Sequence, residues 1–151
     1  MRSLFLVLFL GTFLNGSAQM LLRYKAHDFL NKSATQIEET QKKLFYNEEY
    51  RGFFALGLKH QKLAVIYYDL NRYNDAICHS ERARNAVYTA WQEHNRPIPR
   101  SWELNPDEKG LVKACPMFNI LDSNLYKYTP QLETEDEPYI GKPLKRIRAK
   151  I

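Results

Sequence analysis

Apolar residues recur at helical spacing in three successive stretches of this chain. In residues 21–46 they return at every third or fourth position, and Lys, Glu and Gln fill most positions between them. The second stretch covers residues 48–70, and the third covers residues 73–94, where the period is cleanest. The pattern predicts three consecutive amphipathic helices, with Asn71 and Arg72 as a tight turn between the last two.

Proline and capping residues mark where the third helix ends and a fourth begins. Pro97 and Pro99 cannot continue a helix, so the third helix ends before them. Residues 105–108 read Asn-Pro-Asp-Glu, which supplies an N-cap, a proline at the first helical position and acidic side chains in the first turn. We expect a short helix from there to about Ala114, and one more turn at residues 123–126.

The N-terminus has the layout of a secretory leader. A basic residue, Arg2, precedes an unbroken apolar run at residues 4–10, and small residues follow at 16–18. This order predicts a signal peptide at residues 1–18 and an exported mature chain that begins near Gln19. The apolar run is too short to cross a bilayer, and no later segment approaches the roughly 20 apolar residues that a span needs. We therefore expect no transmembrane span.

Beyond the helices the hydrophobic period disappears. Acidic residues gather at 133–137 and basic residues at 142–150, and no apolar repeat runs through them. We therefore divide the mature chain into a helical bundle domain at residues 19–128 and an extended or disordered tail at residues 129–151. Instead of remaining an exposed linker, the tail could order on a partner, on its own bundle or against anionic lipid.

Two cysteines remain in a compartment that permits disulfides: Cys78 in the third predicted helix and Cys115 after the fourth. A bond between them would fasten the C-terminal part of the domain to the helices. The alternative is a pair of buried thiols that behave as small hydrophobic groups. Sequence spacing does not decide between the two.

Charge and motifs argue against nucleic-acid binding, metal binding and catalysis. The formal net charge is +5, but basic residues are interspersed with acidic ones except in the tail. The histidines form no i, i+4 ligand pair and no HExxH, and the chain has no GxSxG and no glycine-rich phosphate loop. We expect a non-enzyme without cofactor or metal. The alternative is an enzyme that uses Arg72 and His79, whose spacing resembles that of helical ribonucleases.

Residues 60–88 carry the large and small side chains of a packed helical hairpin. Small residues let the two helix axes approach, and bulky ones fill the space beside them. Asn71 stands in the turn and tolerates the left-handed conformation that glycine supplies. In these features the stretch resembles one tetratricopeptide repeat, with matching positions at Leu63, Ala64, Tyr67, Tyr73, Ala76, Ile77 and Ala83. The alternative is an unrelated antiparallel helical pair.

The resemblance covers one repeat, and about three are needed to build a solenoid with a continuous core. We therefore predict an all-α fold. It is a three- to four-helix antiparallel bundle in which the tetratricopeptide-like hairpin of residues 48–94 packs on the first helix.

Aromatic residues are more numerous than a small bundle is expected to bury. The chain has 10 Tyr, 8 Phe and 2 Trp, and more than one helical face is apolar around residues 53–58 and 67–68. This surplus predicts a hydrophobic, tyrosine-rich patch that faces a partner, and the alternative is that every ring is core. The residues that we expect to contact a partner are Phe54, Tyr68, Arg84 and Trp91 of the bundle and Lys145, Arg146 and Arg148 of the tail.

In overall plan the chain resembles small helical periplasmic proteins of Gram-negative envelopes, which usually serve as adaptors. The resemblance implies a protein–protein interaction adaptor in the periplasm, at the inner face of the outer membrane. It would be an accessory subunit of a secretion or assembly complex, such as the type IX apparatus, with envelope proteins as partners. The basic tail could add a peripheral membrane contact. A self-associating structural subunit is the other alternative, and the sequence leaves the oligomeric state open.

Overall fold

The computed structural model describes residues 2–46, 50–125, 127 and 144–151, with side chains from Ser17 onward. The described residues form helices and contain no strand. The predicted all-α fold is therefore confirmed. In chain order the helices are α1 (Arg2–Leu44), α2 (Gly52–Asp69), α3 (Tyr73–Glu93), the 3-10 helix η1 (Arg100–Trp102), α4 (Pro106–Val112) and α5 (Phe118–Leu125).

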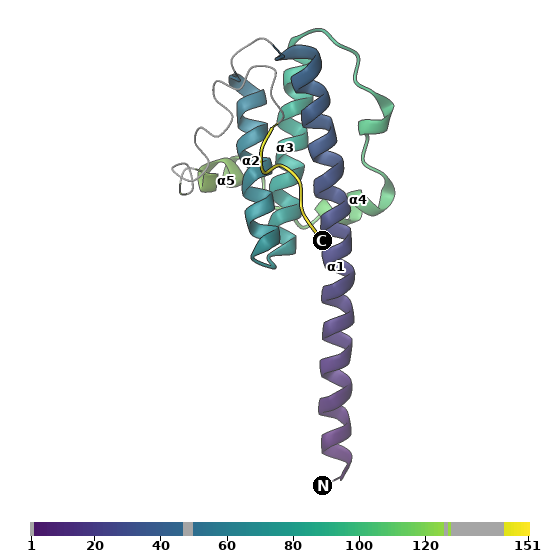
Figure 1. Cartoon of the computed structure of the whole chain (residues 1–151). Helices are drawn as coiled ribbons and strands as arrows, with labels where there is room; N and C mark the ends of the chain where they lie inside the picture. Colours follow the sequence, from purple (N-terminus) through teal and green to yellow (C-terminus); the bar gives the residue numbers. More distant parts are fainter. Residues whose placement is uncertain (1, 47–49, 126, 128–143) are drawn as a thin grey trace.

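Three long helices form the body of the bundle (Figure 1). α2 and α3 run antiparallel to each other, and the C-terminal half of α1 packs along both of them. The short helices lie on opposite sides, α4 next to α1 and α3, and α5 next to α2 and α3. The N-terminal half of α1 extends past the bundle.

The predicted helix boundaries differ from the structure most at the N-terminus. The first helix begins at Arg2 instead of residue 21, so it runs through the segment that we interpret as a leader. A signal peptide at residues 1–18 stays a prediction. In the part of the chain that the structure describes, we find no helix with the length and apolar character needed to cross a membrane.

Two helix ends are closed by asparagines in the left-handed conformation. At the end of α2, Asn71 has φ 59°, its N–H donates to Tyr68 O at 2.9 Å, and Arg72 N–H donates to Tyr67 O at 2.8 Å. Asn95, with φ 53°, closes α3 in the same way. Both ends are Schellman motifs, which satisfy the last carbonyls of a helix. Asn71 thus adopts the left-handed conformation that the sequence suggested.

α2 and α3 approach closely because the residues at their crossing are small. Gly57 of α2 faces α3, and a Cβ added there would lie 2.8 Å from Val87 Cγ2 and 3.0 Å from Ala83 O. Ala83 and Val87 are fully buried. The crossing therefore requires a residue without a side chain at position 57.

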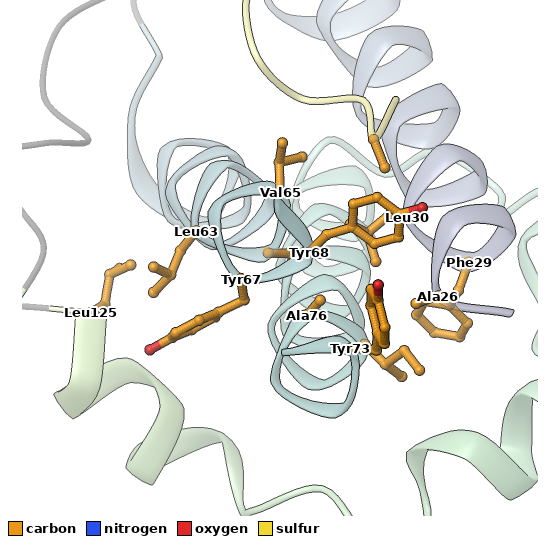
Figure 2. Packing of buried hydrophobic residues seen from close by; sticks show 13 residues of the cluster. Ala26, Phe29, Leu30, Leu63, Val65, Tyr67, Tyr68, Tyr73, Ala76 and Leu125 are labelled. Carbon is orange, nitrogen blue, oxygen red and sulfur yellow. The ribbon is translucent and has the colours of Figure 1, made fainter. Parts of the chain in front are cut away.

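The apolar core consists of two neighbouring clusters. Figure 2 shows the first, in which Tyr68 of α2 and Tyr73 of α3 lie beside Ala26, Phe29 and Leu30 of α1. The ring centroids of Tyr68 and Tyr73 are 5.4 Å apart. The second cluster lies nearer the other end of the bundle and contains Ala34, Ile37, Phe45, Tyr50, Phe54, Leu58, Ala83, Val87, Ala90, Trp91, Trp102 and Ile147.

The patch that we expected on the surface is part of this core. Segments distant in sequence cover it: Phe45 stacks on Phe54 at a centroid distance of 4.6 Å, and Trp102 packs edge-on against Trp91 at 4.9 Å. The prediction that these bundle residues form an exposed patch is therefore wrong. The residues concerned are Phe54, Tyr68, Arg84 and Trp91, which are 0%, 4%, 6% and 3% exposed.

Replacing Gly57 with alanine should destabilise the protein by about 1–3 kcal/mol, because the new methyl group would press on Val87 and the backbone of Ala83. Gly110→Ala in α4 is the matched control, because a Cβ there meets nothing within 4 Å. Urea unfolding followed by circular dichroism gives both free energies of unfolding. Equal stability of the two variants would contradict the close approach of α2 and α3.

Candidate functional site

The C-terminal segment, residues 144–151, lies along α1 and α2 (Figure 1). Ile147 and Ala149 are 2% and 6% exposed, and Arg148 between them is exposed. The segment has neither helix nor strand, yet residues 146–150 alternate between solvent and core. Of the arrangements considered for the tail, this part adopts the one on its own bundle, and residues 129–143 lie outside the described residues.

Side-chain amides of the helices bind the main chain of this segment. Gln61 of α2 donates from Nε2 to Ile147 O at 2.7 Å. Asn31 of α1 accepts the N–H of Ala149 on Oδ1 at 3.1 Å, and its Nδ2 lies 3.5 Å from Ala149 O. Contacts of this kind reach the main chain and supply affinity for an extended segment, whereas the pockets that hold alternate side chains, here Ile147 and Ala149, supply specificity.

Gln61 is fully buried, and its amide is satisfied on every side. Nε2 also donates to Leu30 O of α1 at 2.9 Å, and Oε1 accepts from Ser80 Oγ of α3 at 3.1 Å. Ser80 Oγ lies 2.7 Å from Ser33 Oγ of α1. One carboxamide thus joins α1, α2, α3 and the C-terminal segment.

A charged contact holds the outer side of the segment. Arg148 Nη2 donates to Glu38 Oε2 at 2.7 Å and Nε donates to Glu38 Oε1 at 3.1 Å, while Nη2 also lies 3.2 Å from Thr35 Oγ1. We call Asn31, Thr35, Glu38 and Gln61 the tail site. Arg148 therefore contacts the chain's own bundle, and Lys145 and Arg146 are exposed beside it.

A second site is a pocket of about 200 Å³ beside α3, which we call the Glu81 pocket. Glu81 is half-buried, and burial raises its pKa to about 7. Among the described residues, Glu81 Oε2 and Arg84 Nη1 are buried without a hydrogen-bond partner. Native proteins rarely leave such groups unsatisfied. The pocket is lined by Gln36, Glu81, Arg84, Asn85, Tyr88, Trp102, Glu103 and Leu104.

Arg84 is engaged away from Glu81. Its Nη2 donates to Trp102 O at 2.8 Å, and its Nη1 lies 3.5 Å from Glu108 Oε1. Glu108 also forms the capping box of α4 with Asn105, which confirms the predicted helix start. Burial acts to raise the pKa of Glu108, but the N–H of Asn105 and the ammonium of Lys32 hold it below its usual value.

A buried polar chain holds α5 on α2 and α3. His60 Nδ1 lies 2.9 Å from His79 Nδ1, and His60 Nε2 lies 2.9 Å from Asp122 Oδ1 of α5. Arg82 binds both oxygens of Asp122, from Nε at 2.7 Å and from Nη2 at 2.8 Å. Burial is the main cause that lowers the pKa of His60 to about 4 and that of His79 to about 3, so both rings are neutral at pH 7.

A disulfide fastens the same region. Cys78 of α3 and Cys115, which precedes α5, are bonded with an Sγ–Sγ distance of 2.04 Å and a Cα–Cα distance of 5.3 Å. The sequence left open whether these cysteines form a disulfide or remain buried thiols, and in the structure they form a disulfide. The bond closes a loop of 37 residues, which restricts the unfolded chain and stabilises the fold.

The ribonuclease-like pair lies in an arrangement that does not favour catalysis. His79 is 3% exposed, and its Nδ1 faces His60. Arg72 pairs with Asp75 at 2.8 Å and lies over the ring of Tyr67, which also packs against His79. A general base must reach the proton that it removes. In the described residues, no group of three or more His, Cys, Asp or Glu is placed to hold a metal ion.

Comparison with known proteins gave no match to a family model, a curated protein or a solved structure. The two candidate sites therefore rest on the geometry of this chain alone. Sequence reasoning did not find Glu81, which reads as part of a solvated face, or Gln61 and Asn31. The one available signal for Gln61 was its place in a run of four polar residues, 59–62, inside an otherwise apolar helix.

Acidification should unfold the protein through His60 and His79. Because both folded pKa values lie below the unfolded value of 6.5, the unfolded state takes up protons first as the pH falls. Each histidine's contribution to the free energy of unfolding is present in full above about pH 6.5, and it is lost as the pH falls towards the folded pKa values of about 4 and 3. Between pH 7 and pH 5 the loss is about 2 kcal/mol per histidine. Urea unfolding across this range measures the loss.

A variant of one ring separates the buried histidines from the other titrating groups. His79→Gln should reduce the acid loss by about half, because one of the two buried rings is then absent. An identical pH dependence in wild type and His79→Gln would show that the buried pair is not its source.

Proposed function

We propose that this chain is an exported, non-enzymatic adaptor that binds a non-helical segment of another envelope protein at the tail site. The compartment that we propose is the periplasm, at the inner face of the outer membrane. The chain would act there as an accessory subunit of a secretion or assembly complex, with type IX secretion as one example.

One observation carries the proposal: the tail site already holds a peptide segment. Gln61 and Asn31 contact the main chain of that segment. Two of the segment's own side chains, Ile147 and Ala149, are buried against the bundle. Main-chain hydrogen bonds combined with side-chain sockets are the features that peptide-binding proteins use. A partner segment with an apolar, a basic and a small residue in succession, like Ile147, Arg148 and Ala149, would reproduce every contact.

The disulfide supports the proposed compartment. Disulfides persist in oxidising compartments, including the bacterial periplasm, and are rare in the cytosol. The bond between Cys78 and Cys115 therefore agrees with an exported chain. The sealed position of His79 supports the non-enzymatic part of the proposal.

Covalent attachment makes the C-terminal segment a competitor of any partner. A tethered segment has an effective concentration that reaches about the millimolar range for a short flexible linker. A partner must therefore bind more tightly than the chain's own C-terminus, or meet a chain whose C-terminus has been displaced. This competition would keep the tail site closed until the correct partner arrives.

The experiment uses the full-length chain with Ile147→Asp, which should eject the segment because a carboxylate cannot occupy a buried apolar position. We expect this variant to bind a labelled peptide of residues 144–151 saturably in fluorescence anisotropy. Wild type should bind at least about tenfold more weakly, because its own segment competes. Adding Asn31→Ala should weaken peptide binding by roughly thirtyfold, since it removes two hydrogen bonds worth about 1 kcal/mol each.

A peptide with aspartate in place of Ile147 is the control, and it should not bind. Failure of the helical Ile147→Asp variant to bind the unaltered peptide would sink the proposal. Size-exclusion chromatography of wild type separates the adaptor from a self-associating subunit, because exchange of C-terminal segments between copies would give a dimer or larger species.

A further inference from the structure

The Glu81 pocket is a second place in the fold where polar side chains surround an open space. It lies between α1, α3 and the segment that joins η1 to α4, and it encloses about 200 Å³. A water molecule occupies about 30 Å³ of the liquid, so the pocket has room for a group larger than a single water. It is separate from the tail site, and the two share no residue.

One oxygen of the Glu81 carboxyl group, Oε2, is buried without a hydrogen-bond partner among the described residues. Arg84, which also lines the pocket, donates from Nη2 to Trp102 O, and its Nη1 forms an ion pair with Glu108 Oε1 at 3.5 Å. A carboxyl group that loses water without gaining a partner destabilises the fold. A carboxyl group in a pocket, with a pKa strongly raised by burial, is a candidate for a functional site.

The charges around Glu81 favour a cation. Arg84 is balanced by Glu108, and Lys32 of α1 also pairs with Glu108 at 3.2 Å. Glu103 adds a second carboxyl group to the lining. Glu39 of α1 accepts a hydrogen bond from Trp102 Nε1 at 3.1 Å and pairs with Lys43 at 3.5 Å. An anion would meet Glu81 and Glu103 with like charge, whereas a cation would meet the carboxyl group of Glu81, whose Oε2 has no hydrogen-bond partner in the part of the chain that the structure describes.

Two aromatic residues line the same space. Tyr88 and Trp102 both belong to the pocket. Aromatic rings attract organic cations through their electron-rich faces, and the attraction grows when the cation is removed from water. A carboxylate beside tyrosine and tryptophan therefore suits an alkyl-ammonium or guanidinium group better than an inorganic ion.

We propose that the Glu81 pocket binds an organic cation, a primary ammonium or a guanidinium group, through an ion pair with the carboxylate of Glu81. The same chemistry is present in a free amine and in a lysine or arginine side chain. The chain thus carries a cation-binding site that is independent of the tail site.

The raised pKa of Glu81 gives the binding a distinct pH dependence. Burial raises this pKa to about 7, whereas Arg84 lowers it and Glu108 raises it. The cation needs the ionised carboxylate, so its binding should release a proton from the fraction of molecules that are protonated. Affinity should therefore be about tenfold weaker at pH 6 than at pH 8.

The experiment titrates full-length protein with three probes: butylammonium, the peptide Gly-Arg-Gly blocked at both ends, and its norleucine counterpart, which is apolar and uncharged. The indole N–H of Trp102 and the backbone N–H of Asn85 serve as NMR reporters. We expect saturable shifts with at least one of the cationic probes and none with norleucine. Preference for the peptide would indicate a side chain of a protein as the source, and preference for butylammonium would indicate a free amine.

Glu81→Gln is the deciding variant. It should bind the cationic probes at least about tenfold more weakly and without the dependence on pH between 6 and 8. It should also unfold at a higher temperature than wild type at pH 8, because it removes a carboxyl group whose ionised form is disfavoured by burial in the folded state. Identical titrations of wild type and Glu81→Gln, equal binding of norleucine, or no saturable shift would each overturn the proposal. None of these outcomes bears on peptide binding at the tail site.

Discussion

The buried carboxamide of Gln61 is the interaction on which the arrangement of this chain depends. It contacts Leu30 of α1, Ser80 of α3 and Ile147 of the C-terminal segment, and each of these contacts is a hydrogen bond in the interior. An amide with this many partners stabilises only one relative position of the elements, because any other leaves a buried polar group unsatisfied. Apolar packing brings the helices together, and the hydrogen bonds of Gln61 fix the position of the C-terminal segment, residues 144–151, on them.

The same division of roles holds for the peripheral elements. α4 is attached through Glu108, which meets Arg84 and Lys32, and α5 is attached through Asp122 and the adjacent disulfide. These elements are too short to be stable alone. Each is held on the three long helices by a polar contact together with a few apolar side chains, such as Leu111 of α4 and Leu125 of α5. Both candidate sites lie where a peripheral segment meets the long helices. The tail site lies under residues 144–151, and the Glu81 pocket lies beside residues 102–104.

Local features could be read from the sequence, whereas contacts between distant segments could not. The turn at Asn71 and the capping box at Asn105 depend on neighbouring residues, so their sequence signals were sufficient. Phe54 and Trp91 were expected at the surface because nothing near them in sequence reveals that Phe45 and Trp102 cover them. Glu81 reads as a solvated residue of α3 for the same reason, since its burial is produced by a segment about 20 residues later.

Hydrogen exchange at the N–H of Ala149 tests the central role of Gln61 most directly. That N–H is bonded to Asn31 Oδ1, so it should exchange slowly in wild type. In Gln61→Leu its exchange should accelerate by at least about tenfold, because the segment loses the bond at Ile147 O. The amides of Ala64 and Ile77, inside α2 and α3, should remain protected. Exchange of Ala149 at the rate of an unstructured peptide in wild type would contradict the account.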